Sequence, residues 1–234
     1  MFRLEEFWQG KDWKMKVLYS KAGVATQILV STIKYDLLID VGDGVLRDLL
    51  EENYDFNKLE AIIITHGHYD HIGGLWTLLG FLRMLGRRRD LKIIAPKNCI
   101  EVKSLVENFI KIYGKTIPYE IILIEVSDGE EIIIGETVIQ AFSVIHRGSI
   151  RHLGVLEPIP ALGYSIRYGD QRIVVSGDTG LCENLIKYVE NADLALIEAT
   201  IKEKSLETSE VHLSIDEAIS IGSKAKKFIL IHKR

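Results

Sequence analysis

Hydrophobic residues in this chain gather in short runs of two kinds. Apolar, β-branched runs such as residues 61–64 and 91–95 are typical of buried strands. Elsewhere apolar residues recur at every third or fourth position, as in 75–85 and 100–113, which predicts helices that bury one face. Strand–loop–helix units follow one another in both halves of the chain. This order favours two mixed sheets with helices outside them, which is an α/β architecture.

Turns rich in glycine and aspartate separate the predicted elements. We expect two strands within 15–30 and further strands at 35–41, 61–64, 91–95, 120–126, 131–134, 137–144, 164–167, 172–176, 194–199 and 228–232. Helices are expected at 45–50, 75–85, 100–113, 183–190 and 215–223. Segment 148–160 contains two prolines and two glycines, so we expect an irregular surface loop there. The arginine run 87–89 is expected to be a solvated helix end.

Candidate chemistry is concentrated directly after the predicted strand 61–64. Three histidines and an aspartate fall within six positions, and they are His66, His68, Asp70 and His71. Imidazole and carboxylate are the usual protein ligands of zinc, iron and manganese. His66 and His68 alternate to one side of the chain, while Asp70 and His71 lie one turn further on. This spacing suits two adjacent metal ions better than one.

Three further ligand-type residues follow apolar strands in the second half of the chain. They are His146, Asp178 and His232. Each directly follows a run of apolar residues, where a polar side chain buried without a partner would be costly. Chemistry in open α/β sheets collects at the carboxyl ends of strands. We therefore expect these residues to complete the metal site that the loop at 66–71 begins.

Composition narrows the class of protein. The 234 residues, 47% of them hydrophobic, fit a single packed domain over 1–234. The balance of 29 Lys and Arg against 33 Asp and Glu gives a formal net charge of −4, which is not typical of a non-specific nucleic-acid binder. Cys99 and Cys182 are too few for a disulfide framework and lack a metal-ligand spacing. With no recognisable signal peptide or membrane span, we expect a cytoplasmic protein that has no membrane partner.

The loop at 66–71 reads His-Gly-His-Tyr-Asp-His, which matches the His-x-His-x-Asp-His signature of the metallo-β-lactamase superfamily. The chain resembles that superfamily and, within it, the ribonuclease Z-like branch. Further motifs of that branch appear in the same order, namely Leu38-Ile39-Asp40-Val41-Gly42-Asp43-Gly44, Ser176-Gly177-Asp178-Thr179, Glu198-Ala199-Thr200, His212-Leu213-Ser214 and Leu230-Ile231-His232. The similarity spans nearly the whole chain, and the combination is far more specific than any single motif.

The resemblance implies a fold, a cofactor and roles for individual residues. The fold would be a four-layer αββα sandwich of two mixed β-sheets flanked by helices. The cofactor would be two divalent metal ions, expected to be Zn²⁺, with Mn²⁺ and Fe²⁺ as alternatives. One ion would be held by His66, His68 and His146, the other by Asp70, His71 and His232, with Asp178 bridging both. Asp40 would orient ligating histidines by hydrogen bonds.

The same resemblance implies a catalytic group of Asp70, Glu198 and His212, with His212 donating a proton to the leaving alkoxide. We therefore expect a dinuclear metal-dependent hydrolase, a phosphodiesterase or ribonuclease Z-like nuclease that attacks with metal-bound hydroxide. A phosphodiester fits because its non-bridging oxygens bind cations and its alkoxide needs a proton. One alternative is a hydrolase of cyclic nucleotides or other small phosphodiesters, sulfate esters, lactones or thioesters. The other is a non-catalytic RNA-binding or metal-binding protein.

The chain departs from ribonuclease Z where that family carries a long arm that grips precursor tRNA. The arm follows a Gly-Tyr motif, whereas here Gly163-Tyr164 is followed by only a short segment before Asp178. We therefore expect an arm-less member of the branch, acting on RNA or on a small nucleotide. Arg147 and Arg151 are candidates for binding a substrate phosphate through bidentate hydrogen bonds. A homodimer is left open.

Overall fold

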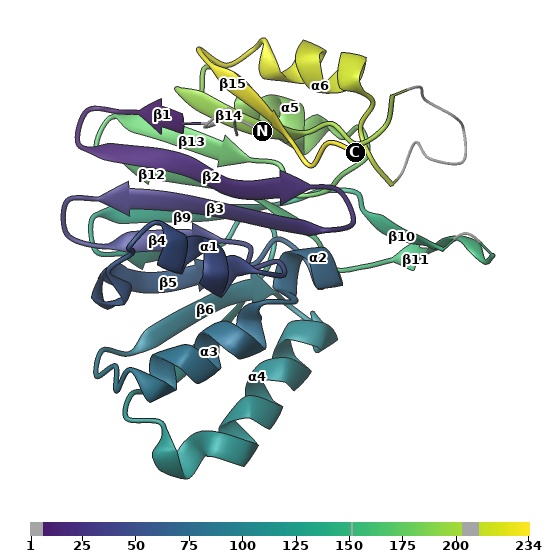
Figure 1. Cartoon of the computed structure of the whole chain (residues 1–234). Helices are drawn as coiled ribbons and strands as arrows, with labels where there is room; N and C mark the ends of the chain where they lie inside the picture. Colours follow the sequence, from purple (N-terminus) through teal and green to yellow (C-terminus); the bar gives the residue numbers. More distant parts are fainter. Residues whose placement is uncertain (1–6, 151, 203–210) are drawn as a thin grey trace. The chain divides into compact units, whose positions relative to one another are not determined.

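A computed structural model describes residues 7–150, 152–202 and 211–234 of the chain. The chain forms two compact units, Met1–Glu125 and Val126–Arg234. Each unit contains one large mixed sheet with helices packed on it (Figure 1). The expected α/β class, with two mixed sheets flanked by helices, is confirmed. That residues 1–234 form a single domain stays a prediction.

The first unit is built on a seven-stranded sheet with strand order β1-β2-β3-β4-β5-β6-β7. The strands are β1 (Phe7–Gln9), β2 (Trp13–Lys21), β3 (Ala25–Thr32), β4 (Asp36–Ile39), β5 (Leu59–Ile63), β6 (Leu91–Pro96) and β7 (Ile121–Val126). Strands β1 to β4 pair antiparallel, whereas β4, β5 and β6 run parallel. The helices are α1 (Val45–Glu51), α2 (Tyr69–Ile72), α3 (Leu75–Met84) and α4 (Ile100–Tyr113), with 3₁₀ turns η1 (Phe56–Lys58) and η2 (Gly114–Thr116).

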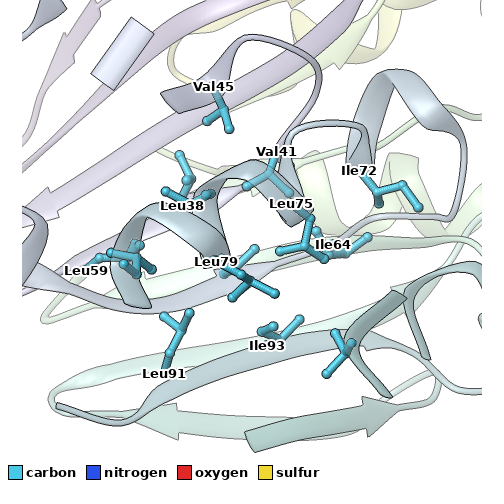
Figure 2. Close-up of a cluster of buried hydrophobic side chains, with 14 of the residues drawn as sticks. Leu38, Val41, Val45, Leu59, Ile64, Ile72, Leu75, Leu79, Leu91 and Ile93 are labelled. Carbon is cyan, nitrogen blue, oxygen red and sulfur yellow. The ribbon is translucent and has the colours of Figure 1, made fainter. Parts of the chain in front are cut away.

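The core of this unit lies between the sheet and its helices. Leu38 of β4 and Ile93 of β6 pack in one cluster with Leu79 of α3 (Figure 2). Burying each such side chain stabilises the fold by about 1.5–3 kcal/mol. Successive strand residues point to opposite faces, and Leu37 and Ile39 on the other face of β4 are also fully buried. The parallel strands are therefore apolar apart from one charged residue near the start of each, which explains their hydrophobic runs.

The second unit is built on a six-stranded sheet with strand order β15-β14-β13-β12-β9-β8. Its strands are β8 (Glu131–Ile134), β9 (Thr137–Ser143), β12 (Leu162–Tyr168), β13 (Gln171–Val175), β14 (Leu194–Glu198) and β15 (Phe228–Ile231). Strands β8, β9, β12 and β13 pair antiparallel, and β13, β14 and β15 run parallel. Helices α5 (Glu183–Val189) and α6 (Ile215–Gly222) pack on it through Leu185, Val189, Ala218 and Ile221. A capping box between Ser214 and Glu217 fixes the start of α6.

The expected irregular loop at 148–160 is wrong. This stretch contains β10 (Arg147–Ile150) and β11 (Gly154–Pro158), which pair antiparallel as a separate ribbon (Figure 1). Most of its side chains are exposed, so the ribbon lacks the alternating apolar face by which a strand is recognised in a sequence. Backbone pairing, rather than burial, holds the two strands together.

The expectation of a solvated arginine run is also wrong for one of its members. Arg87 is only 4% exposed, and its guanidinium donates to the carbonyl oxygens of Phe56, Leu59, Arg89 and Asp90. Two of these carbonyls belong to the first residues of η1 and β5 and two to the loop before β6, and the Arg87 side chain satisfies them. Among the described residues, no helix is both long enough and apolar enough to span a lipid bilayer.

Candidate metal centre

In the first unit the parallel strand β5 ends directly before the histidine-rich loop. His66 and His71 are almost fully buried, and their ring centroids lie 4.1 Å apart. His66 Nε2 lies 3.0 Å from His68 Nδ1. The turn of helix α2, which the sequence did not predict, carries Asp70 and His71. The four ligand-type side chains of this loop are therefore gathered at the carboxyl end of the strand.

A buried carboxylate at the end of the neighbouring strand β4 holds this loop. Asp40 has a left-handed backbone (φ 55°) and accepts hydrogen bonds from the Thr65 backbone N–H and the Thr65 hydroxyl, each at 2.8 Å. It also lies 2.7 Å from His71 Nδ1. Because a carboxylate can only accept, His71 carries its proton on Nδ1 and its lone pair on Nε2. Such a partner fixes the orientation of a metal-binding imidazole.

The turn between β2 and β3 holds the carboxylate of Asp70. The backbone N–H of Gly23 donates to Asp70 Oδ2 at 2.9 Å. The Tyr69 hydroxyl donates to the carbonyl oxygen of the same Gly23 at 2.7 Å. Asp70 is thus fixed by a turn far away in the sequence, a contact that no local sequence pattern signals.

In the second unit a second set of ligand-type side chains gathers at strand ends. Asp178 follows β13 after Gly177, whose left-handed backbone (φ 61°) turns the chain there. Asp178 Oδ2 lies 3.4 Å from His232 Nε2 and 3.8 Å from His212 Nδ1. His146 is buried and its Nδ1–H donates to the carbonyl oxygen of Val211 at 2.8 Å, so its Nε2 carries the lone pair.

Glu198, at the end of β14, organises this second set. Its carboxylate is fully buried and accepts backbone N–H groups from Thr179, Thr200 and Leu213 at 3.0–3.1 Å. It also accepts the Thr200 hydroxyl at 2.9 Å and lies 2.9 Å from His212 Nδ1. Such a fully enclosed carboxylate acts on a bound molecule only through another group. That group is His212, whose side chain is 17% exposed.

The residues present fit divalent metal ions. Two ligand atoms that each lie about 2.0–2.2 Å from a tetrahedral zinc ion are roughly 3.2–3.6 Å apart. The 3.4 Å separation of His232 Nε2 and Asp178 Oδ2 falls in this range, and the 3.0 Å separation of His66 Nε2 and His68 Nδ1 is close to it. The donors are imidazole nitrogens and carboxylate oxygens, which suit zinc, manganese or iron. The assignment of particular ligands to a first and a second ion stays a prediction.

Of the two candidate substrate-binding arginines, the structure describes Arg147. Arg147 begins β10, and its Nη1 donates across the ribbon to the carbonyl oxygen of Leu156 at 3.2 Å. At least one of its donors therefore serves the ribbon itself. Arg151 lies outside the described residues.

Sequence reasoning assigned no role to two buried threonines. Thr65 lies beside Asp40 and His66, and Thr200 lies beside Glu198 and His232. The available signal was their position next to ligand-type residues, since Thr65 directly precedes His66 and Thr200 stands in the Glu-Ala-Thr motif.

A profile of the Beta-lactamase superfamily domain matches residues 35–232. Ribonuclease Z of Pyrococcus abyssi (strain GE5 / Orsay) is 29% identical over 235 residues, which cover 83% of this chain and 75% of the relative. The metallo-β-lactamase fold protein YhfI from Bacillus subtilis matches with a TM-score of 0.77 at 25% identity, over 95% of this chain and 87% of that one. The short form of human tRNase Z matches with a TM-score of 0.77 at 19% identity, over 94% and 92%, which shows the fold alone.

The profile covers most of the chain, including every candidate metal ligand from His66 to His232. The similarity to Ribonuclease Z and to the metallo-β-lactamase fold structures agrees with this profile match. The chain therefore belongs to the metallo-β-lactamase superfamily, as a ribonuclease Z-like member.

Proposed function

We propose that this protein is a metal-dependent phosphodiesterase that cleaves RNA or a small nucleotide. The observation that carries the proposal is the pairing of buried Glu198 with partly exposed His212, beside Asp178 and His232. Metal ligands alone would fit many hydrolases of this fold. A histidine held by a carboxylate next to those ligands adds a proton donor for a poor leaving group.

The proposed ligands are those that the sequence resemblance implies. On the sequence resemblance, His66, His68 and His146 hold one ion, Asp70, His71 and His232 hold the other, and Asp178 bridges them. When bound, such a pair of ions would lower the pKa of water toward ~7 and neutralise phosphate charge. The Nδ1–H tautomers of His71 and His146 leave Nε2 for coordination, in agreement with this assignment.

The protein's own residues supply the proton that the reaction needs. In a phosphodiester the leaving alkoxide is a strong base, and its departure is assisted by protonation. His212 donates Nδ1–H to Glu198, so Nε2 is the ring atom that transfers a proton to the substrate. The buried carboxylate accepts Nδ1–H and holds the ring in place.

Two other functions remain as alternatives. Thioester hydrolysis needs the proton donor less, because a thiolate leaves readily, whereas sulfate esters and lactones would use the same site in a similar way. A non-catalytic RNA-binding or metal-binding protein would have no need for the Glu198–His212 pair. Similarity to Ribonuclease Z of Pyrococcus abyssi supports the nuclease reading. The short connection from Gly163 to Asp178 supports a small phosphodiester as the competing substrate.

The experiment is a substrate panel on purified protein, first stripped with a chelator and then reloaded with Zn²⁺, Mn²⁺ or Fe²⁺. The panel contains bis(p-nitrophenyl) phosphate, an RNA with a 3′ extension, a cyclic nucleotide, a sulfate ester, a lactone and a thioester. We expect phosphodiester hydrolysis that requires metal and is lost in His68→Ala and Asp178→Ala. Phosphodiester hydrolysis retained by both variants would contradict the proposal, as would turnover of the thioester alone.

A further inference from the structure

Thr65 in the first unit stands between a carboxylate and a candidate metal ligand. Its side chain is buried, and Oγ1 lies 2.8 Å from Asp40 Oδ2 and 3.1 Å from His66 Nδ1. Its backbone N–H also donates to Asp40, at 2.8 Å. The hydroxyl has one proton, and a carboxylate can only accept. The proton therefore goes to Asp40, and the oxygen accepts Nδ1–H from His66.

Thr200 in the second unit stands in the same relation to Glu198 and His232. Its buried Oγ1 lies 2.9 Å from Glu198 Oε2, 2.9 Å from the His232 carbonyl oxygen and 2.8 Å from His232 Nδ1. Two of these neighbours can only accept, and the hydroxyl has a single proton. If that proton went to Nδ1, the hydroxyl oxygen would face two acceptor oxygens with no hydrogen between them. The remaining arrangement has Nδ1–H of His232 donating to Thr200.

We propose that Thr65 and Thr200 are positioning residues that fix His66 and His232 as Nδ1–H tautomers. In that tautomer the lone pair is on Nε2, which is the nitrogen near His68 in the first unit and near Asp178 in the second. A histidine in the other tautomer would present N–H where a metal ion must bind. The setting of the tautomers stands on the hydrogen bonds alone, whereas its use in metal binding rests on the proposed function.

Each carboxylate thereby controls two histidines. Asp40 accepts Nδ1–H of His71 directly and acts on His66 through Thr65. Glu198 accepts Nδ1–H of His212 directly and acts on His232 through Thr200. The carboxylate precedes the threonine by 25 residues in the first unit and by 2 in the second. The common feature is thus an arrangement of hydrogen bonds in space, with no repeated sequence motif behind it.

The test uses Thr65→Val and Thr200→Val, which remove the hydroxyl with little change of shape, and the matching Thr→Ser variants, which retain it. Thr32→Val is the control, because buried Thr32 donates its hydroxyl to the Tyr35 carbonyl oxygen. Histidine tautomers are read from long-range ¹H–¹⁵N spectra of the metal-free protein at a pH where imidazole is neutral. Zinc affinity is measured separately by competition with a chelating dye.

We expect His66 and His232 to be Nδ1–H tautomers in the wild-type protein. Thr65→Val should convert His66 alone to a mixture, and Thr200→Val should do so for His232 alone. The serine variants should keep the wild-type tautomers, and Thr32→Val should leave both unchanged. Zinc affinity should fall by roughly 10–100-fold in the valine variants, the usual cost of losing an outer hydrogen-bond partner of a ligand.

An Nε2–H tautomer for His66 or His232 in the wild-type spectrum would overturn the inference, even if no valine variant can be purified. So would unchanged tautomers in folded valine variants. A different result would contradict the proposed function alone. In that case the tautomers change in the threonine variants as expected, but the wild-type protein hydrolyses no phosphodiester with any metal.

Discussion

His212 Nδ1 lies 2.9 Å from Oε1 of Glu198, and the carboxylate is fully buried while the imidazole is 17% exposed. Because of this difference in exposure, the two residues have different roles. Glu198, enclosed by backbone N–H donors, fixes the ring and the proton on Nδ1. His212 is the member that can meet a substrate. In the proposed function the pair acts as a general acid, and solvent returns the proton that His212 gives to the leaving group.

Replacing His212 by alanine should therefore affect substrates according to their leaving group. Hydrolysis of an alkyl phosphodiester should fall by about 10²–10⁴-fold, which is the usual contribution of a general acid. Hydrolysis of bis(p-nitrophenyl) phosphate should fall much less, because nitrophenolate leaves without a proton. Steady-state kinetics on both esters, with zinc content measured in the same samples, checks this. Equal losses on the two esters would mean that His212 only positions other groups.

Gly42 should tolerate no side chain, because a Cβ there would lie 2.4 Å from the Asp70 carbonyl oxygen and 2.7 Å from the Ala25 Cα. Both atoms belong to backbone that cannot move aside easily, so Gly42→Ala should destabilise the fold by about 1–3 kcal/mol. Gly80→Ala is the matched control, since nothing lies within 4 Å of a Cβ at that helical position. It should stabilise by about 0.5–1 kcal/mol. Urea unfolding of both variants measures the difference; equal effects would contradict the packing described for Gly42.

Arg87 and Arg88 are adjacent in sequence and should behave oppositely. Arg87→Met leaves buried carbonyl oxygens without donors, at a cost of about 1–3 kcal/mol for each unsatisfied group. Arg88 is exposed, so Arg88→Met should change stability by no more than about 0.5 kcal/mol. Denaturant midpoints compare the two variants. If Arg87→Met unfolds at the same midpoint as Arg88→Met, the role assigned to Arg87 is wrong.

As the pH rises, the ionisation of Asp36 and that of Asp193 should change the free energy of unfolding in opposite directions. Burial raises the pKa of Asp36 and outweighs the attraction of Lys58. The folded state then binds more protons than the unfolded chain, so Asp36 lowers stability as the pH rises above ~3.9. At Asp193 burial is the largest single effect and raises the pKa, but the hydrogen bonds from Lys226 and from the Arg172 backbone, together with the charges of both residues, outweigh it and lower the pKa. Asp193 therefore contributes stability above ~3.9 that is lost as the pH falls below it.

Two asparagine variants measure these signs. Relative to the wild-type protein, Asp36→Asn should gain stability between pH 3 and pH 6, and Asp193→Asn should lose stability over the same range. Free energies of unfolding at several pH values supply the comparison. A gain for Asp193→Asn or a loss for Asp36→Asn would contradict the assigned environments.

Much of the architecture follows from the sequence, because several strands that carry the site, such as β4 and β14, are buried along their whole length. The bounds of β8 and α4, 131–134 and 100–113, agree with the expected ones to the residue. The sequence predicted that His66, His71, Asp178 and His232 follow such strands, and the structure places each of them there. Apolar runs and the polar residues that end them are local features, and a single sequence displays them directly.

What the sequence did not reveal depends on contacts between distant residues. The β10–β11 ribbon buries no apolar face, and so its residues carry no periodic pattern. Arg87 looks like any charged residue at a helix end until the carbonyls of Phe56 and Leu59 are placed beside it. Thr65 and Thr200 gain their roles only when Asp40 and His232 come into hydrogen-bonding distance. Such partners are fixed by tertiary structure.

The central claim is that the proposed ligand set of His66, His68, Asp70, His71, His146, Asp178 and His232 binds two metal ions, and counting those ions tests it most directly. Zinc per chain is measured by elemental analysis after saturation and removal of excess metal, in wild-type protein, His68→Ala, Asp178→Ala and the folded control Arg88→Met. We predict two zinc ions in the wild-type protein and in Arg88→Met, and loss of most bound zinc in both ligand variants. Two zinc ions retained in His68→Ala and in Asp178→Ala, or fewer than two in the saturated wild-type protein, would contradict the account.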